Sequence, residues 1–384
     1  MSLKAFIHVQ HLLGTGHVVR AAGIGKALAA SGVEVTLASG NRIPPTLDTG
    51  PLDVIELPAC KSPDAAFKQL VTLEGEAVDD AWKSARVHAS IQAFEKQDYD
   101  LLLTETYPFG RRQLDFELAP LLDTARARSR PPLIATSIRD ILVRKKELWK
   151  ERWMADQALK YYDRILVHSD PDFIALADSF PFADDVDHLV RYTGYVGGAP
   201  RPVFGSRDGA DEVIVSCGGG AVAGALLSAV LDARPLSRRA EDTPWRVLIG
   251  HDISDDAFAI YRQSAAEGIL VERARKDFPE LLKHARLSVS QAGYNTVLDI
   301  LVAGVPAVFV PFAQANETEQ TQRADALARH GRAIVTPETG LTPERLAAAI
   351  DDALALPRST HAVRLGGAEE SARVLLADLQ DRQS

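Results

Sequence analysis

The chain has 384 residues, of which 46% are hydrophobic and 25% are charged, as in an ordinary globular protein. At roughly 100–200 residues per domain, we expect two domains that each bury a core. The net charge of −9 argues against nucleic-acid partners, and two cysteines, Cys60 and Cys217, exclude a disulfide framework or a cysteine-based zinc site.

The first residues run directly into a predicted strand, Lys4–Val9, without the basic and long apolar segments of a signal peptide. No apolar run approaches the ~18 residues that a membrane-spanning helix needs. We therefore expect a cytoplasmic protein that is at most peripheral on the inner face of the membrane.

The first half of the chain alternates strand and helix patterns, which indicates a parallel sheet with helices on both faces. Residues 64–96 are expected to be mostly helical. The remaining predictions are a helix over His17–Ser31 and strands over Val33–Ala38, Leu101–Thr104, Leu133–Thr136 and Ile165–His168.

Glycine and proline are dense in residues 195–205, which we interpret as a linker between domains 1–195 and 206–384. The second half repeats the alternation, so we expect an α/β protein with two doubly wound, Rossmann-like domains facing across a cleft. The last helix is expected to pack back on the first domain. Predicted strands are Glu212–Ser216, Trp245–Ile249, Leu287–Val289 and Ala307–Val310, and predicted helices are Val222–Leu231 and Asn295–Ala303.

The turn Gly14-Thr15-Gly16-His17 follows the first strand, where open parallel sheets bind ligands. Its glycines allow a tight turn and a close approach by a substrate. The imidazole of His17 titrates near neutral pH, as suits a general base for an acceptor hydroxyl. The alternative is a glycine turn with a helix-capping histidine. Position 19 is Val19, so the full dinucleotide-binding fingerprint is missing.

A second glycine-rich turn, Gly218-Gly219-Gly220-Ala221, lies between a strand and a helix. Its backbone N–H groups and the helix N-terminus favour binding of a phosphate or diphosphate. The alternative is a turn needed only for helix–strand packing. Cys217 fits a small buried residue better than a nucleophile.

Polar residues open the next predicted helix, with Gly293 at its start and Asn295, Thr296 and Asp299 along it. Asn295 and Asp299 are one turn apart and share a face, where a carboxylate can accept both hydroxyls of a ribose. The alternative is that Asp299 is a solvated helix residue.

Two further polar segments follow predicted strands. Glu319 and Gln320 suit sugar hydroxyls, or else form an exposed helix start. Glu105 could act as a base or orient an acceptor. Arg111 and Arg112 could bind an anionic acceptor, or could instead balance acidic residues on a helix face.

These motifs resemble glycosyltransferase family 28 over about residues 212–335. The resemblance is carried by Gly218–Gly220, by the run from Ala292 to Pro306, and by Val310-Pro311-Phe312 with Glu319 and Gln320. Gly14–His17 matches the glycine-rich turn of the family. The run Glu105–Arg112 is also found in a branch of predicted bacterial glycosyltransferases.

The resemblance implies a GT-B fold and an inverting, metal-independent transfer of sugar from a nucleotide donor, without a cofactor. Domain 1–195 would bind the acceptor and domain 206–384 the nucleotide sugar. Gly218–Ala221 would hold the diphosphate, Asp299 the ribose, and Glu319 and Gln320 the sugar, while His17 would be the base. Asp299 replaces the usual glutamate of the family, and the diphosphate loop lacks its frequent serine.

The expected donor is a UDP-sugar, either UDP-N-acetylglucosamine or a UDP-hexose, and the expected acceptor is a glycan, a lipid-linked or a small hydroxyl compound. Two alternatives are a nucleotide-sugar hydrolase on the same scaffold and a non-catalytic nucleotide-sugar-binding protein. The basic, aromatic segment 144–154, with Trp149 and Trp153, fits either contact with an anionic membrane or a core face bordered by charges.

Overall fold

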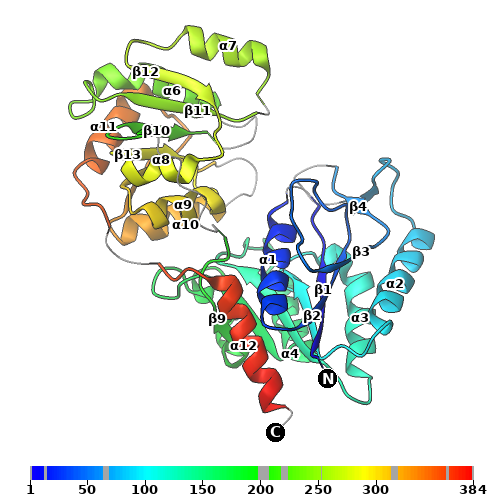
Figure 1. Cartoon of the computed structure of the whole chain (residues 1–384). Coiled ribbons are helices and arrows are strands. Elements are labelled where there is room, and N and C mark those ends of the chain that lie inside the picture. Colours follow the sequence, from blue (N-terminus) through cyan, green and yellow to red (C-terminus); the bar gives the residue numbers. More distant parts are fainter. Residues whose placement is uncertain are drawn as a thin grey trace. The chain divides into compact units, whose positions relative to one another are not determined.

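The computed structural model describes residues 2–12, 15–63, 69–197, 207–217, 224–251, 253–312, 319–359 and 363–382. The chain divides into two compact units (Figure 1). The first comprises Met1–Gly197 together with Arg364–Ser384, and the second comprises Gly198–Val363. Within the described residues, no helix is both long enough and apolar enough to cross a membrane.

The first unit is built on a parallel sheet with the strand order β3-β2-β1-β6-β7-β8-β9. Its central strands are buried throughout, as expected for a sheet covered on both faces. The strands are β1 (Lys4–Val9), β2 (Glu34–Ser39), β3 (Asp53–Glu56), β6 (Leu101–Glu105), β7 (Leu133–Arg139), β8 (Arg164–His168) and β9 (Val190–Tyr192).

Helices cover both faces of this sheet. On one face, α1 (Gly16–Ala30) and α12 (Gly367–Asp381) pack side by side in a shared core. An ion pair of 2.7 Å between Arg164 and Asp378 connects α12 to the start of β8. The other face carries α2 (Asp80–Glu95), α3 (Asp115–Arg126), α4 (Leu148–Tyr161) and α5 (Ala183–Val186), with the short 3₁₀ helices η1 (Arg112–Leu114), η2 (Leu176–Asp178) and η3 (Asp187–Leu189).

The second unit has a six-stranded parallel sheet with the order β12-β11-β10-β13-β14-β15. Its core lies between the sheet and helices α6 and α11. The strands are β10 (Val213–Ser216), β11 (Trp245–Ile249), β12 (Ile269–Arg273), β13 (Leu287–Ser290), β14 (Ala307–Phe309) and β15 (Ala333–Val335). The helices are α6 (Gly224–Ala233), η4 (Arg234–Leu236), α7 (Asp255–Gln263), α8 (Phe278–His284), α9 (Tyr294–Ala303), α10 (Glu319–Arg329) and α11 (Pro343–Ala353).

The expected helix over residues 64–96 is wrong in its first half. Residues 64–68 lie outside the described part, and a strand, β5 (Val71–Thr72), pairs antiparallel with β4 (Cys60–Lys61). Gly75 has a φ of +94°, which turns the chain after this strand. The helix begins only at Asp80, because Asp79 caps it by accepting a hydrogen bond of 2.7 Å from the Trp82 backbone amide.

Candidate active site

In each sheet, the direction in which successive strands of the chain are added reverses at one point. In the first unit this point lies between β1 and β6, and in the second between β10 and β13. Open α/β sheets bind ligands beyond the carboxyl ends of the strands at such a switch point. At the first switch point, His17 lies in the helix that follows β1, and Glu105 is the last residue of β6. The Gly218–Ala221 and Gly293 turns follow the strands that flank the second.

His17 and Glu105 are in direct contact in the first unit. The side chain of His17 lies in the first turn of α1 and is 14% exposed, whereas that of Glu105 is almost fully buried. The Nδ1 atom of His17 lies 3.0 Å from Oε1 of Glu105. Thr15 and Gly16 begin α1 and are exposed, and a Cβ added to Gly16 would meet no atom within 4 Å. Gly14 lies outside the described residues.

The Glu105 carboxylate accepts hydrogen bonds on both of its oxygens. Arg20 forms an ion pair with it, and its Nε lies 3.4 Å from Oε2. The hydroxyl of Thr106 donates to Oε1 over 3.0 Å, and that of Ser137 donates to Oε2 over 2.7 Å. With His17, four side chains therefore hold this carboxylate in one orientation.

These contacts fix the charge states of the pair. Burial outweighs the hydrogen bond with Glu105 and lowers the pKa of His17 to about 4. Burial also opposes ionisation of Glu105, but Arg20 and the hydrogen bond from His17 prevail and place the pKa of that carboxyl well below its usual value. At neutral pH the pair is thus a neutral imidazole beside a carboxylate, so Nδ1–H donates and Nε2 keeps its lone pair.

Three residues of this network were not predicted from the sequence: Arg20, Ser137 and His168. Ser137 also lies 2.7 Å from Nε2 of His168, and burial and Arg20 lower the pKa of His168 to about 3. None of them belongs to a recognisable sequence motif. Only the adjacency of β6, β7 and β8 brings Glu105, Ser137 and His168 together.

Arg111 lies near this network, whereas Arg112 has different surroundings. Arg111 has a left-handed backbone with a φ of +60°. Its burial, together with the nearby charge of Arg139, lowers its pKa to about 10. Arg112 is exposed, and its guanidinium carbon lies 5.0 Å from the ring centre of Trp149.

The segment 144–154 is a core face only in part. Trp153 packs edge-on against Tyr107 with 6.0 Å between ring centroids, and Met154 is buried in the same region. Leu148 and Trp149, at the start of α4, are 57% and 56% exposed. The segment therefore has a buried face and an exposed apolar end.

In the second unit, helix α9 presents the predicted ribose residues. Gly293 is its N-cap, and because it has no side chain it leaves the first amides of the helix uncapped. Asn295 is exposed, and Thr296 and Asp299 are half-buried, while the apolar residues between them face the core. The Gly218–Ala221 turn lies outside the described residues.

Glu319 and Gln320, predicted to contact the sugar, make contacts within the protein. Glu319 is buried at the start of α10 and pairs with Arg323 over 2.7 Å. Arg323 is also buried and donates to the carbonyl oxygen of Ala292, in the turn before α9, over 2.9 Å. Gln320 accepts a hydrogen bond of 3.2 Å from the Phe312 amide. Both residues therefore tie the start of α10 to its neighbouring turns.

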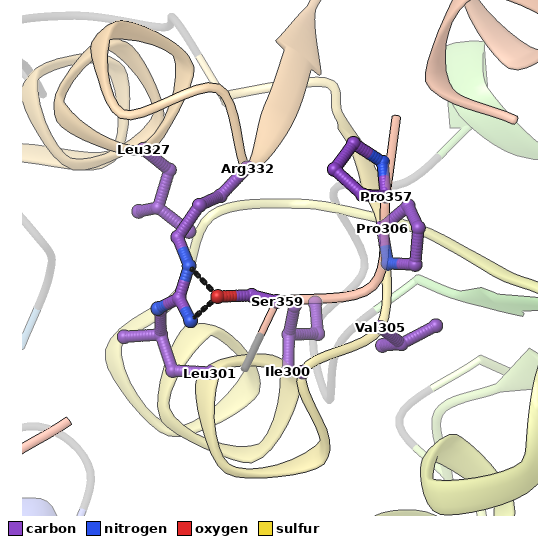
Figure 2. Close-up of a pocket in the computed structure, with 9 residues that line it drawn as sticks. Ile300, Leu301, Val305, Pro306, Leu327, Arg332, Pro357 and Ser359 are labelled. Carbon is purple, nitrogen blue, oxygen red and sulfur yellow. Dashed lines mark hydrogen bonds between the residues drawn. The ribbon is translucent and has the colours of Figure 1, made fainter. Parts of the chain in front are cut away.

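Figure 2 shows a small pocket of the second unit, where the guanidinium of Arg332 donates to the hydroxyl of Ser359. Its lining includes Gly304 and Pro306, which lie within three residues before β14, while Arg332 directly precedes β15. The pocket thus lies at the amino ends of the strands, opposite the edge that carries Gly293 and Asn295. It does not coincide with the predicted donor site.

The second half of the chain is similar to a known protein family. Residues 213–373 match the model of the glycosyltransferase family 28 C-terminal domain. A Rhodospirillum centenum UDP-N-acetylglucosamine–N-acetylmuramyl-(pentapeptide) pyrophosphoryl-undecaprenol N-acetylglucosamine transferase is 30% identical over 196 residues, or 47% of this chain and 51% of that enzyme. The enzyme of the same name from Mesorhizobium japonicum is 36% identical over 134 residues, or 33% of this chain and 36% of that enzyme. The chain thus spans about half or less of the length of these relatives.

Solved structures resemble nearly the whole chain. The glycosyltransferase of kitacinnamycin matches with a TM-score of 0.63 at 16% identity, over 100% of this chain and 99% of its own. Acinetobacter baumannii MurG matches with a TM-score of 0.59 at 18% identity, over 97% and 99%. At such identities the likeness shows the fold, which is GT-B. Residues 213–373 are therefore similar to the glycosyltransferase family 28 C-terminal domain, in a chain that has the two-unit GT-B fold.

Proposed function

We propose that this protein is a glycosyltransferase that moves a sugar from a UDP-sugar to a hydroxyl acceptor with inversion and without a metal. The family 28 match and the names of the relatives, which use UDP-N-acetylglucosamine, support the nucleotide-sugar donor. The observation that carries the proposal is the His17–Glu105 contact at the switch point of the first sheet. A transferase needs a base at that position to take the proton of the acceptor.

His17 is the base in this proposal, and Glu105 orients it. The Glu105 oxygens already accept hydrogen bonds from His17, Arg20, Thr106 and Ser137, and the pKa of this carboxyl is lowered, so it is a poor proton acceptor. Nε2 of His17 has its lone pair available. When His17 takes the acceptor proton, the charge of Glu105 stabilises the imidazolium that forms.

The donor is assigned to the second unit. Asp299 and Asn295 on one face of α9 would bind the ribose hydroxyls, and the uncapped amides beyond Gly293 would face the diphosphate. The predicted Gly218–Ala221 loop would share that charge. Amides and a helix dipole would then stabilise the departing UDP in place of a divalent metal. Glu319 would support this edge through Arg323.

The acceptor is assigned to the first unit. Arg20 and Arg111 interact electrostatically with Glu105, and Arg139 interacts with Arg111. These guanidinium groups favour an acceptor with an anionic group, such as a lipid-linked or phosphorylated glycan. The exposed Leu148 and Trp149 would then contact an anionic membrane in which such an acceptor resides.

The test is a transfer assay with radiolabelled UDP-N-acetylglucosamine and UDP-glucose against a panel of phospholipid, glycolipid and small hydroxyl acceptors. We expect acceptor-dependent UDP release that persists in EDTA and falls by at least a hundredfold in His17→Ala. Free sugar released without an acceptor would instead support the hydrolase. Tight UDP binding without turnover on any acceptor would support a non-catalytic nucleotide-sugar-binding protein.

A further inference from the structure

A continuous series of buried hydrogen bonds runs behind Glu105, on the side away from His17. Ser137 Oγ lies 2.7 Å from Glu105 Oε2 and 2.7 Å from Nε2 of His168. Nδ1 of His168 lies 2.7 Å from the hydroxyl oxygen of Thr193. Ser137, His168 and Thr193 are each at most 3% exposed and come from β7, β8 and the residue after β9.

Simple valence rules give this series a direction. An ionised carboxylate can only accept, so the single hydroxyl proton of Ser137 is donated to Glu105. Ser137 must then accept from His168, which requires a proton on Nε2 of that ring. A neutral imidazole carries one N–H, so Nδ1 of His168 accepts from Thr193. Every donor in the series therefore points toward Glu105.

We infer that Ser137 and His168 are positioning residues that hold the Glu105 carboxylate in place. The inference rests on the proposed role of His17 as base. With Oε2 anchored by Ser137, Oε1 faces Nδ1 of His17 and fixes the tautomer that leaves Nε2 unprotonated. The two histidines thus have opposite tautomers: Nδ1–H in His17 and Nε2–H in His168.

A histidine with only a structural role would have the same tautomer, because its hydrogen bonds set it. Its removal would, however, change stability without changing the ring of His17. The charged groups that face His17 are Glu105, Arg20 and Arg111. Those that face His168 are Arg20 and Glu105, so both rings share the same carboxylate and the same guanidinium.

The first measurement uses the whole protein without ligand. Imidazole ¹⁵N chemical shifts at pH 7, with the rings assigned by His→Gln substitution, report the tautomer of each ring. We expect neutral rings, with Nδ1–H in His17 and Nε2–H in His168. An Nδ1–H tautomer or a charged ring at His168 would overturn the inference, whatever the enzyme does.

The second measurement compares three variants. Ser137→Ala and His168→Leu remove the donor to Glu105 or its support, whereas the side-chain amide of His168→Gln can still donate to Ser137. We expect a mixture of His17 tautomers and at least a tenfold lower kcat, with unchanged donor KM, in the first two variants. His168→Gln should keep a single His17 tautomer and kcat within threefold of wild type.

If Ser137→Ala and His168→Leu both kept a single Nδ1–H tautomer of His17 and the wild-type kcat, the series of hydrogen bonds would contribute to core packing alone. The failure of this inference can be distinguished from the failure of the proposed function, because the tautomers are measured in the absence of any reaction. If His17→Ala left transfer unchanged while the tautomers were as expected, the base assignment alone would fall.

Discussion

The substitution Glu105→Gln removes the charge of the orienting carboxylate. The amide oxygen can replace Oε1 and still accept from His17, while the amide nitrogen takes the place of Oε2 beside Ser137. The contact with His17 is thus kept and the charge is lost, while the amide nitrogen, which can only donate, no longer accepts hydrogen bonds from Ser137 and Arg20. For unit charges about 4 Å apart at an effective dielectric of 20, the lost attraction to the imidazolium is about 4 kcal/mol. At 1.36 kcal/mol per tenfold change in rate, we expect a loss of about 10³ in kcat.

The assay is steady-state UDP release at pH 7, with UDP affinity measured in parallel by calorimetry. Glu147→Gln is the matched control, since the side chain of Glu147 is 51% exposed and lies at the start of α4. UDP affinity should be unchanged in both variants, because the predicted nucleotide site belongs to the other unit. Because Glu105→Gln also leaves Arg20 without a carboxylate, thermal unfolding is recorded for each variant. A folded Glu105→Gln variant with kcat within threefold of wild type would refute the role of the charge.

Three further predictions concern acid stability, the second unit and the membrane. Burial lowers the pKa values of His17 and His168 to about 4 and about 3. The free energy of unfolding that the two neutral rings contribute is therefore complete above pH ~6.5 and is lost as the pH falls toward those values. The melting temperature should drop between pH ~6.5 and ~4, and a flat profile would contradict this. Arg323→Met removes a buried partner of Glu319 and should lower the free energy of unfolding by about 3–5 kcal/mol, or the melting temperature of the second unit by roughly 6–20 °C. Substitution of the exposed Arg329 in Arg329→Met should change the melting temperature little. Equal melting temperatures of the two variants would argue against the connection to the turn before α9. Leu148→Ser/Trp149→Ser should weaken sedimentation with phosphatidylglycerol vesicles at least tenfold and leave UDP affinity unchanged; undiminished sedimentation would place membrane contact elsewhere.

The sequence predicts most of the two sheets, because buried parallel strands are continuous apolar runs. Lys4–Val9 and Trp245–Ile249 have the predicted bounds. The short strands β3, β9, β12 and β15 were not predicted, since three to five residues of mixed burial give little periodic signal. Residues 69–79 were misread as helix because the turn at Gly75 was not recognised.

The sequence predicted those residues of the candidate site that come directly after a strand or at its end. It did not predict those that are brought together only by the order of the strands in the sheet. His17 and Glu105 were found from their positions after the first strand and at the end of a later one. Ser137, His168 and Arg20 are distant in sequence from Glu105, and only the order β1-β6-β7-β8 makes them its neighbours. The pairing of Glu319 with Arg323 four residues later was not predicted, although such i,i+4 pairs are common on helices, and the contact of Glu319 with the sugar stays a prediction.

The most direct test of the account is calorimetry of UDP, GDP, dTDP and ADP binding to the wild type and to Asp299→Ala, with and without magnesium. We predict that UDP binds best, that magnesium is not needed, and that Asp299→Ala weakens UDP binding by at least tenfold. If no nucleotide binds, or if Asp299→Ala binds UDP as the wild type does, the donor site assigned to α9 is contradicted, and in the first case the transferase proposal falls with it.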